Sequence, residues 1–120
     1  MEQKVILRIV DDIVIIDSPK EMTMTYSNNL YVEILKAYNK NKYDVIFNME
    51  KTKYISSFGI SILIIAMRNA RENNGEVKLA MLSDSVKKMI DSMDFQTLFE
   101  VYPSVQAALK AFKEKNKPEK

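Results

Sequence analysis

Segments with the two-residue period of β-strands alternate along this chain with segments that have the period of α-helices. The strand-like segments are rich in aliphatic residues: Val5–Ile9, Ile13–Ile16, Tyr43–Met49, Val77–Met81 and Leu98–Val101. A helix-like segment follows each strand after the first. The order β-β-α-β-α-β-α-β-α predicts an α/β fold with a mixed, mostly parallel sheet of about five strands, because helices that connect successive strands impose right-handed crossovers and pack on the sheet.

Capping residues mark the expected ends of the helices. The segment Lys20–Tyr26 is expected to be a loop, and Thr25 or Ser27 is a candidate cap for the first helix. Ser83 is expected to cap the third helix. Pro103 is expected to open the fourth, because a proline at the first helical position loses no intrahelical hydrogen bond.

The length and composition of the chain indicate a single globular domain. Its 120 residues are 47% hydrophobic and include only two glycines and three prolines. We expect the domain to span residues 1–113 and the Lys- and Glu-rich segment 114–120 to be a disordered polar tail. The net charge of +2 indicates no nucleic-acid binding.

The absence of cysteine and histidine limits the reactions and metal sites that the chain could support. No cysteine and no histidine occur, which removes disulfides, thiolate metal sites and the usual general base. Asp11, Asp12 and Asp17 have the spacing of a hairpin rather than of a calcium loop. We therefore expect no catalytic residue, metal or cofactor, and a protein that is not an enzyme. No apolar run approaches the ~20 residues of a membrane-spanning helix, so we expect a cytoplasmic protein without membrane insertion.

Two serines and a glycine mark the junction between the third strand and the second helix. This helix is expected from about Gly59 to Asn73, with a left-handed stop at Asn74-Gly75. Free backbone N–H groups at a helix start stabilise a phosphate in front of them. Ser56 and Ser57 are therefore candidates either for capping this helix or for carrying a phosphate.

The element order and this junction together resemble a STAS domain, the fold of bacterial anti-sigma-factor antagonists. The resemblance extends from Val5 to about Phe112. It rests on an apolar pair, a hydroxyl-rich turn, a glycine and an aliphatic residue at the helix start: Tyr54-Ile55-Ser56-Ser57-Phe58-Gly59-Ile60.

The resemblance implies a protein that switches partners. The family's phosphorylated serine falls on Ser57, and Ser56 is the second choice. An unphosphorylated member binds an anti-sigma factor that is also a serine kinase, a phosphorylated member releases it, and a serine phosphatase resets the cycle. The implied partner surface is the first turn of the second helix and the loop beside it, with Phe58, Gly59, Thr23 and Met24.

Two family acids are absent beside the acceptor. The aspartate that precedes the serine is Ser56 here, and a gapless pairing of the earlier loop puts Thr23 at the other acidic position. The loss lowers the repulsion that a phosphate would feel, but it also removes groups that could orient the hydroxyl for a kinase. The effects oppose each other, and the sequence does not rank them.

Several alternatives remain open from the sequence alone. Ser57 could be only an N-cap, and Phe58 could be either an exposed interface anchor or part of the core. The chain could also be a STAS scaffold or sensor subunit that binds without a phosphate, or a module that binds a small molecule or lipid. The sequence does not fix the oligomeric state.

Overall fold

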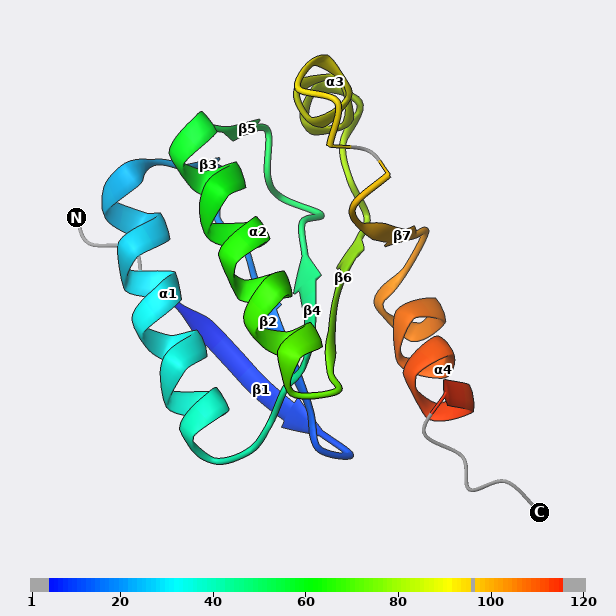
Figure 1. Ribbon diagram of the computed structural model, residues 1–120. Helices are drawn as coiled ribbons and strands as arrows, with labels where there is room; N and C mark the ends of the chain where they lie inside the picture. Colours follow the sequence, from blue (N-terminus) through cyan, green and yellow to red (C-terminus); the bar gives the residue numbers. More distant parts are fainter. Residues whose placement is uncertain (1–4, 96, 116–120) are drawn as a thin grey trace.

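A five-stranded mixed sheet forms the centre of the computed structural model, which describes residues 5–95 and 97–115 (Figure 1). The strand order is β1-β2-β4-β6-β7. Only β1 runs antiparallel to its neighbour, which confirms the predicted mixed, mostly parallel sheet. The strands are β1 (Ile6–Val10), β2 (Ile13–Asp17), β4 (Asp44–Asn48), β6 (Glu76–Ala80) and β7 (Glu100–Tyr102). The last strand starts two residues later than predicted.

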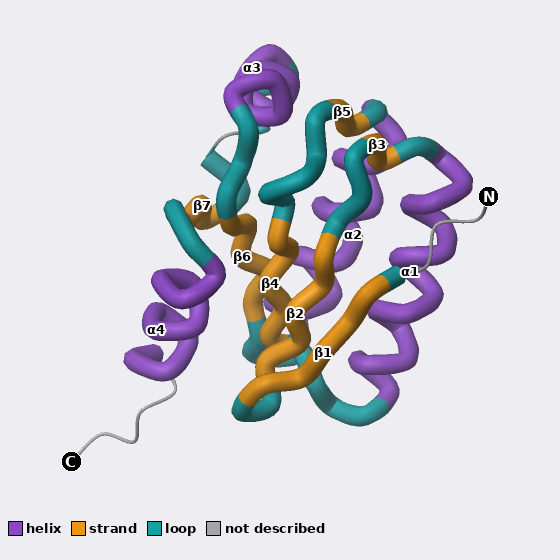
Figure 2. The backbone as a smooth tube through the Cα atoms, turned by 180° about the vertical axis from the view of Figure 1, so that it is seen from behind, coloured by secondary structure: helices purple, strands orange, loops and turns teal. Residues whose placement is uncertain are grey.

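Four helices connect or follow these strands: α1 (Met24–Asn39), α2 (Ser57–Glu72), α3 (Asp84–Ser92) and α4 (Val105–Lys115). α1 and α2 lie side by side on one face of the sheet, whereas α4 lies on the other (Figures 1 and 2). The Tyr38 hydroxyl donates to the Ala66 carbonyl at 2.7 Å and joins α1 to α2. Burial raises the pKa of this phenol, which therefore stays protonated as a donor.

Each face of the sheet has its own apolar core. The larger core lies under α1, α2 and α3 and includes Val45, Phe47 and Leu79. The smaller core lies under α4 and includes Ile46 and Phe112. Odd-numbered residues of β4, such as Val45 and Phe47, face the larger core, and the even-numbered Ile46 faces the smaller one, as the two-residue period requires.

A buried lysine is part of the smaller core. The Lys78 ammonium donates to the Glu100 carboxylate and to the Tyr102 hydroxyl, and it lies 4.7 Å from the centre of the Phe112 ring. Burial lowers the pKa of Lys78, but the hydrogen bonds to Glu100 and Tyr102 outweigh burial and raise it overall. Lys78 therefore stays charged and ties β6, β7 and α4 together.

Two turns show why particular residues were needed. Asp11 and Asp12 both have positive φ, 51° and 67°, which fits the two-residue hairpin turn between β1 and β2. After α2, Asn74 takes the left-handed conformation with φ of 65°. A Cβ at Gly75 would lie only 2.2 Å from the Tyr43 carbonyl oxygen, so this glycine allows the chain to pass close to β4.

A second, two-stranded sheet is present that the sequence did not predict. It pairs β3 (Glu21–Met22) in parallel with β5 (Tyr54–Ile55) and joins the segments that precede α1 and α2. Strands of two residues have no readable period, so the Lys20–Tyr26 segment was wrongly expected to be only a loop.

The predicted cap of α1 was also wrong. Thr23 is the N-cap, and its hydroxyl accepts from the Tyr26 amide at 3.5 Å. Thr25 and Ser27 lie inside the helix instead, and Ser27 is fully buried. The helix starts earlier because its first turn packs Tyr26 and Ser27 inward.

The end of α4 changes the expected domain boundary. The helix continues to Lys115, two residues into the segment expected to be a disordered tail, and residues 116–120 lie outside the described residues. Within the described ranges, no helix is long and apolar enough to cross a membrane. No group of three or more acidic residues that could hold a metal ion occurs in the same ranges.

Candidate functional site

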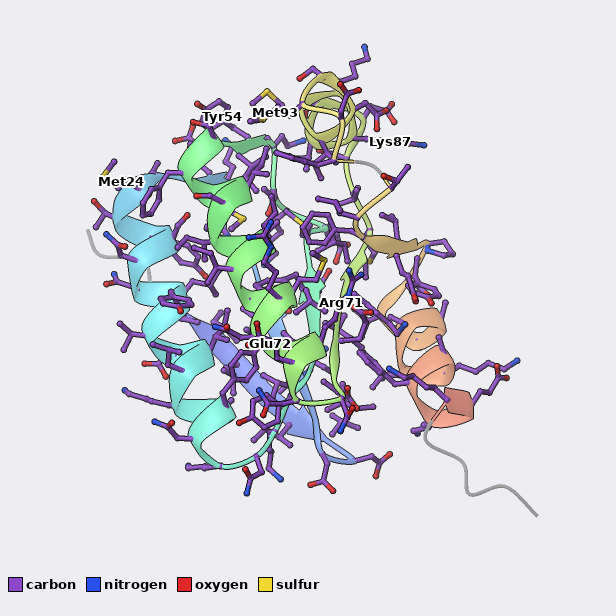
Figure 3. The ribbon with its side chains drawn as sticks, in the orientation of Figure 1. Met24, Tyr54, Arg71, Glu72, Lys87 and Met93 are labelled. Atoms are coloured by element: carbon purple, nitrogen blue, oxygen red, sulfur yellow. The ribbon has the colours of Figure 1, made fainter. Side chains whose placement is uncertain are left out.

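The starts of α1 and α2 lie together at one end of the molecule, joined by the β3–β5 pair (Figure 1). The Ser56 amide donates to the Met22 carbonyl at 3.2 Å and fixes the two segments to each other. Met24 and Tyr54 both lie at this end (Figure 3). The structure thus brings the six predicted site residues to one place: Thr23, Met24, Ser56, Ser57, Phe58 and Gly59.

Ser56 is the N-cap of α2, and both functions of its hydroxyl are in use. The oxygen accepts from the Gly59 amide at 3.0 Å, and the hydroxyl donates to the Met22 carbonyl at 3.1 Å. A cap of this kind stabilises a helix by about 1 kcal/mol. A phosphate on Ser56 would remove the bond to Met22 and crowd the cap.

Ser57 differs from Ser56 in its exposure and in the hydrogen bonds of its hydroxyl. It is the first residue of α2, and its side chain is exposed. Its hydroxyl makes no hydrogen bond with any described residue. The amides of Ser57 and Phe58 also find no acceptor within the described residues. An accessible hydroxyl therefore lies at the positive end of a helix dipole.

Gly59 has a packing role. It is buried, and a Cβ there would lie 2.9 Å from Ile55 Cγ1 and 3.2 Å from the Met22 carbonyl oxygen. The absence of a side chain lets the start of α2 lie directly against β3, β5 and α1. The resemblance implies that Gly59 belongs to the partner surface, but a buried glycine contributes to such a surface only by placing its neighbours.

The two apolar candidates differ in exposure. Met24 is 60% exposed, whereas Phe58 is partly buried. Phe58 is not among the described residues that form or pack against either core. Tyr54 on β5, which sequence reasoning missed, is also exposed. The alternation of Tyr54 with the buried Ile55 was the signal that could have found it.

The two segments that contain the site residues carry no charge over a long stretch of sequence. No charged residue occurs in Thr23–Val32 or in Tyr54–Met67, although 28% of the chain is charged. We call the exposed residues of these two segments the neutral surface: Thr23, Met24, Thr25, Asn28, Asn29, Val32, Tyr54, Ser57, Ser61 and Ile65. Such a surface suits a protein partner and is sensitive to an added charge.

A buried tyrosine beneath this surface holds its proton. The Tyr26 hydroxyl donates to the Asp17 carbonyl oxygen at 3.2 Å. Burial, with a smaller contribution from the Asp17 charge, raises the pKa of Tyr26 to about 12. This phenol is therefore neutral at physiological pH and is poorly suited to act as a base.

A pocket among the described residues lies away from this site. It measures about 540 Å³ and lies between α3 and the ends of β6 and β7, with Leu79, Phe99 and Val101 among its lining residues. A module that binds a small molecule or lipid through the loop at Met24 would need that loop, with Thr23 and Met24, to cover a cavity. No residue of this loop lines this pocket.

The geometry defines a small α/β domain whose candidate site is a helix start with a free hydroxyl. Residues 4–108 match the family model of the STAS domain, so the chain belongs to the STAS domain family. The resemblance that the sequence suggested is thereby confirmed, together with the fold class.

Several proteins are similar to this chain over most of its length. BtrV of Bordetella bronchiseptica, named as an anti-sigma factor antagonist, is 28% identical over 87 residues, which are 72% of this chain and 75% of that protein.

Solved structures share the fold at lower identity. SpoIIAA in its unphosphorylated form gives a TM-score of 0.83 at 18% identity and covers 92% of this chain and 97% of its own. An anti-sigma factor antagonist from Mycobacterium paratuberculosis gives 0.79 at 16% identity and covers 90% of this chain and 92% of its own.

Proposed function

We propose that this protein is an anti-sigma factor antagonist of the cytoplasm that is controlled by phosphorylation. Unphosphorylated, it binds an anti-sigma factor that is also a serine kinase. Phosphorylation of Ser57 releases this partner, and a serine phosphatase restores binding. The proposal is supported by membership of the STAS family and by the names of similar proteins.

The observation that carries the proposal is the division of roles between two adjacent serines. Ser56 uses its hydroxyl to cap α2, whereas the Ser57 hydroxyl is exposed and unbonded among the described residues. A kinase can reach Ser57 without breaking a hydrogen bond that holds the fold. Ser57 is therefore the phosphoacceptor of choice.

The neutral surface explains how a phosphate would act as a switch. Phosphoserine adds about −1.5 to −2 charges at pH 7. The helix start tolerates this charge, because its free amides and dipole favour an anion. A partner packed against Met24, Phe58 and Tyr54 would have to bury the charge, which is costly without a counter-charge. The phosphate thus changes binding and leaves the fold intact.

One observation favours a second function, a STAS scaffold that binds without a phosphate. Thr23 and Ser56, which stand where the family has acids, are both helix caps here. They offer no carboxylate to orient the Ser57 hydroxyl for a kinase. In this case the neutral surface would bind its partner constitutively.

The test is phosphorylation by the serine kinase whose gene lies nearest. The protein is incubated with ATP and this kinase, and its intact mass is measured, with Ser57→Ala and Ser61→Ala as matched variants. We expect one added phosphate on the wild type and on Ser61→Ala, and none on Ser57→Ala. An unmodified wild type, or a modified Ser57→Ala, would contradict the switch and favour the scaffold.

A further inference from the structure

The outer edge of β1 has no strand partner among the described residues. β1 ends the strand order, and only its inner edge pairs, with β2 (Figure 2). An unpaired edge presents backbone N–H and C=O groups that pair readily with another strand.

The register of the hairpin shows which backbone groups face outward. Asp11 and Asp12 form a two-residue turn, so Val10 and Ile13 make the hydrogen-bonded pair that closes it. Hydrogen-bonded and non-hydrogen-bonded pairs alternate along an antiparallel ladder. Leu7 and Ile9 are therefore in non-hydrogen-bonded pairs with β2, and their N–H and C=O groups face the open edge.

The side chains of β1 are unusually apolar for an open edge. Ile6 is 60% exposed and Ile9 is 47% exposed, on opposite faces of the sheet. Arg8 is the only charged residue between Ile6 and Val10. Natural edge strands usually carry several charges, a proline or a bulge that prevents pairing.

We propose that β1 pairs antiparallel with β1 of a second copy of this chain, about a two-fold axis at Leu7. In this register Leu7 faces Leu7 of the copy, and Val5 faces Ile9 on the same side of the sheet. On the other side, Ile6 faces Arg8, whose aliphatic stem covers it. The outward groups of Leu7 and Ile9 then lie in hydrogen-bonded pairs.

A competing register is less favourable. An axis at Arg8 would also satisfy the outward backbone groups, but it would place Arg8 directly opposite Arg8 of the copy. Like charges in directly opposed positions destabilise a strand pair. This repulsion favours the axis at Leu7 over the axis at Arg8.

The dimer would hold two neutral surfaces apart. A two-fold axis normal to the sheet keeps α1 and α2 of both copies on the same face and reverses the direction of the strands. The starts of α2 then lie at opposite ends of a continuous sheet. This inference stands independently of the proposed function.

Single cysteines test the register, because the chain has none of its own. Opposed residues of a hydrogen-bonded pair have Cα atoms about 5.5 Å apart, within the range of about 4.4–6.8 Å that a disulfide spans. We expect Leu7→Cys to form a disulfide-linked dimer under mild oxidation and Arg8→Cys to remain monomeric on a non-reducing gel. More dimer with Arg8→Cys, or none with Leu7→Cys, would overturn this register.

Sedimentation of the cysteine-free protein tests the interface without cross-linking. We expect the wild type to form a concentration-dependent dimer and Ile9→Lys to raise its dissociation constant at least about tenfold, because lysine blunts an edge. Val101→Lys is the matched control, since Val101 is 48% exposed on β7, the opposite edge strand. A monomeric wild type, or an equal effect of Val101→Lys, would overturn the proposal.

Discussion

The starts of α2 and α3 use the same capping arrangement but present different surfaces. In each, a serine accepts from the amide three residues on: Ser56 from Gly59 at 3.0 Å, and Ser83 from Val86 at 3.3 Å. Each serine also donates to a backbone carbonyl of a distant segment, that of Met22 at 3.1 Å and that of Thr52 at 2.9 Å.

The difference lies in the residues that follow each cap. Next to Ser83, Asp84 places a charge at the helix start, and the Ser85 hydroxyl donates to the Lys53 carbonyl at 2.9 Å. Next to Ser56, Ser57 is neutral and unbonded among the described residues. Both serines at the start of α3 serve the structure, whereas the start of α2 leaves one hydroxyl available. An available hydroxyl, rather than residue type alone, therefore marks a candidate phosphoacceptor.

The largest expected effect comes from exchanging the third helical residue. Gly59→Val gives α2 the residue of α3, and we expect a loss of about 3 kcal/mol of unfolding free energy, because even a Cβ would lie 2.9 Å from Ile55 Cγ1. Ile65→Val, on the exposed face of the same helix, should change it by less than about 0.5 kcal/mol. Denaturant titration measures both. A fully stable Gly59→Val would mean that α2 does not lie this close to β5.

Replacing either of the two N-cap serines should lower the stability of the fold by a similar amount. Ser56→Ala and Ser83→Ala each remove one cap and one donor, and we expect each to cost about 1–2 kcal/mol in thermal or denaturant unfolding. A much smaller loss for Ser56→Ala would show that Ser56 is not the cap of α2.

Lowering the pH should reduce the stability of the fold through Glu100 on β7 and should not affect the start of α2. The hydrogen bond from Lys78 lowers the pKa of Glu100 below its model-compound value of 4.5. The pair therefore stabilises the fold above pH 4.5 and is lost as the pH falls through the lowered pKa. We expect Glu100→Gln to lower the melting temperature at pH 7, by the equivalent of at most about 1 kcal/mol because Glu100 is half exposed.

As the pH falls from 7 through this lowered pKa, the difference between Glu100→Gln and the wild type should shrink, because the wild-type carboxyl then loses its charge. Ser57→Ala should follow the wild type throughout this acid titration. A gap that stays constant to the acid end of the titration would show that the Glu100 charge does not contribute.

The smallest expected changes in stability are those of replacing Ser57 and Ser85, the serines that lie beyond the two caps. Ser85→Ala loses its bond to the Lys53 carbonyl and should cost about 0.5 kcal/mol. Ser57→Ala loses no hydrogen bond to a described residue and should leave the unfolding free energy within error. Measured destabilisation of Ser57→Ala by more than about 1 kcal/mol would assign Ser57 a structural role.

The periodic parts of the chain were predictable, and the short junctions were not. Residues such as Val45 and Leu79 belong to apolar runs long enough to reveal a period, so the five strands and four helices could be predicted. The β3–β5 pair could not, because Met22 and Ile55 owe their pairing to contacts between distant segments.

The roles of the hydroxyl residues were equally hidden. Thr23, Thr25 and Ser27 are equivalent as caps by residue type, and the inward packing of Tyr26 and Ser27, rather than a local pattern, sets where the helix starts. Ser56 and Ser57 could both be singled out from the sequence. Which of them caps α2 depends on the close approach of Met22, which no local pattern encodes.

Partner binding by matched Ser57 variants tests the central claim most directly. Isothermal titration of the anti-sigma factor encoded nearest the gene would compare the wild type, Ser57→Ala, Ser57→Asp and, as a matched control, Ser85→Asp. We predict that Ser57→Ala and Ser85→Asp bind like the wild type, whereas Ser57→Asp, although folded, binds at least about tenfold more weakly because it places a charge in the interface. Equal binding by Ser57→Ala and Ser57→Asp would contradict the account.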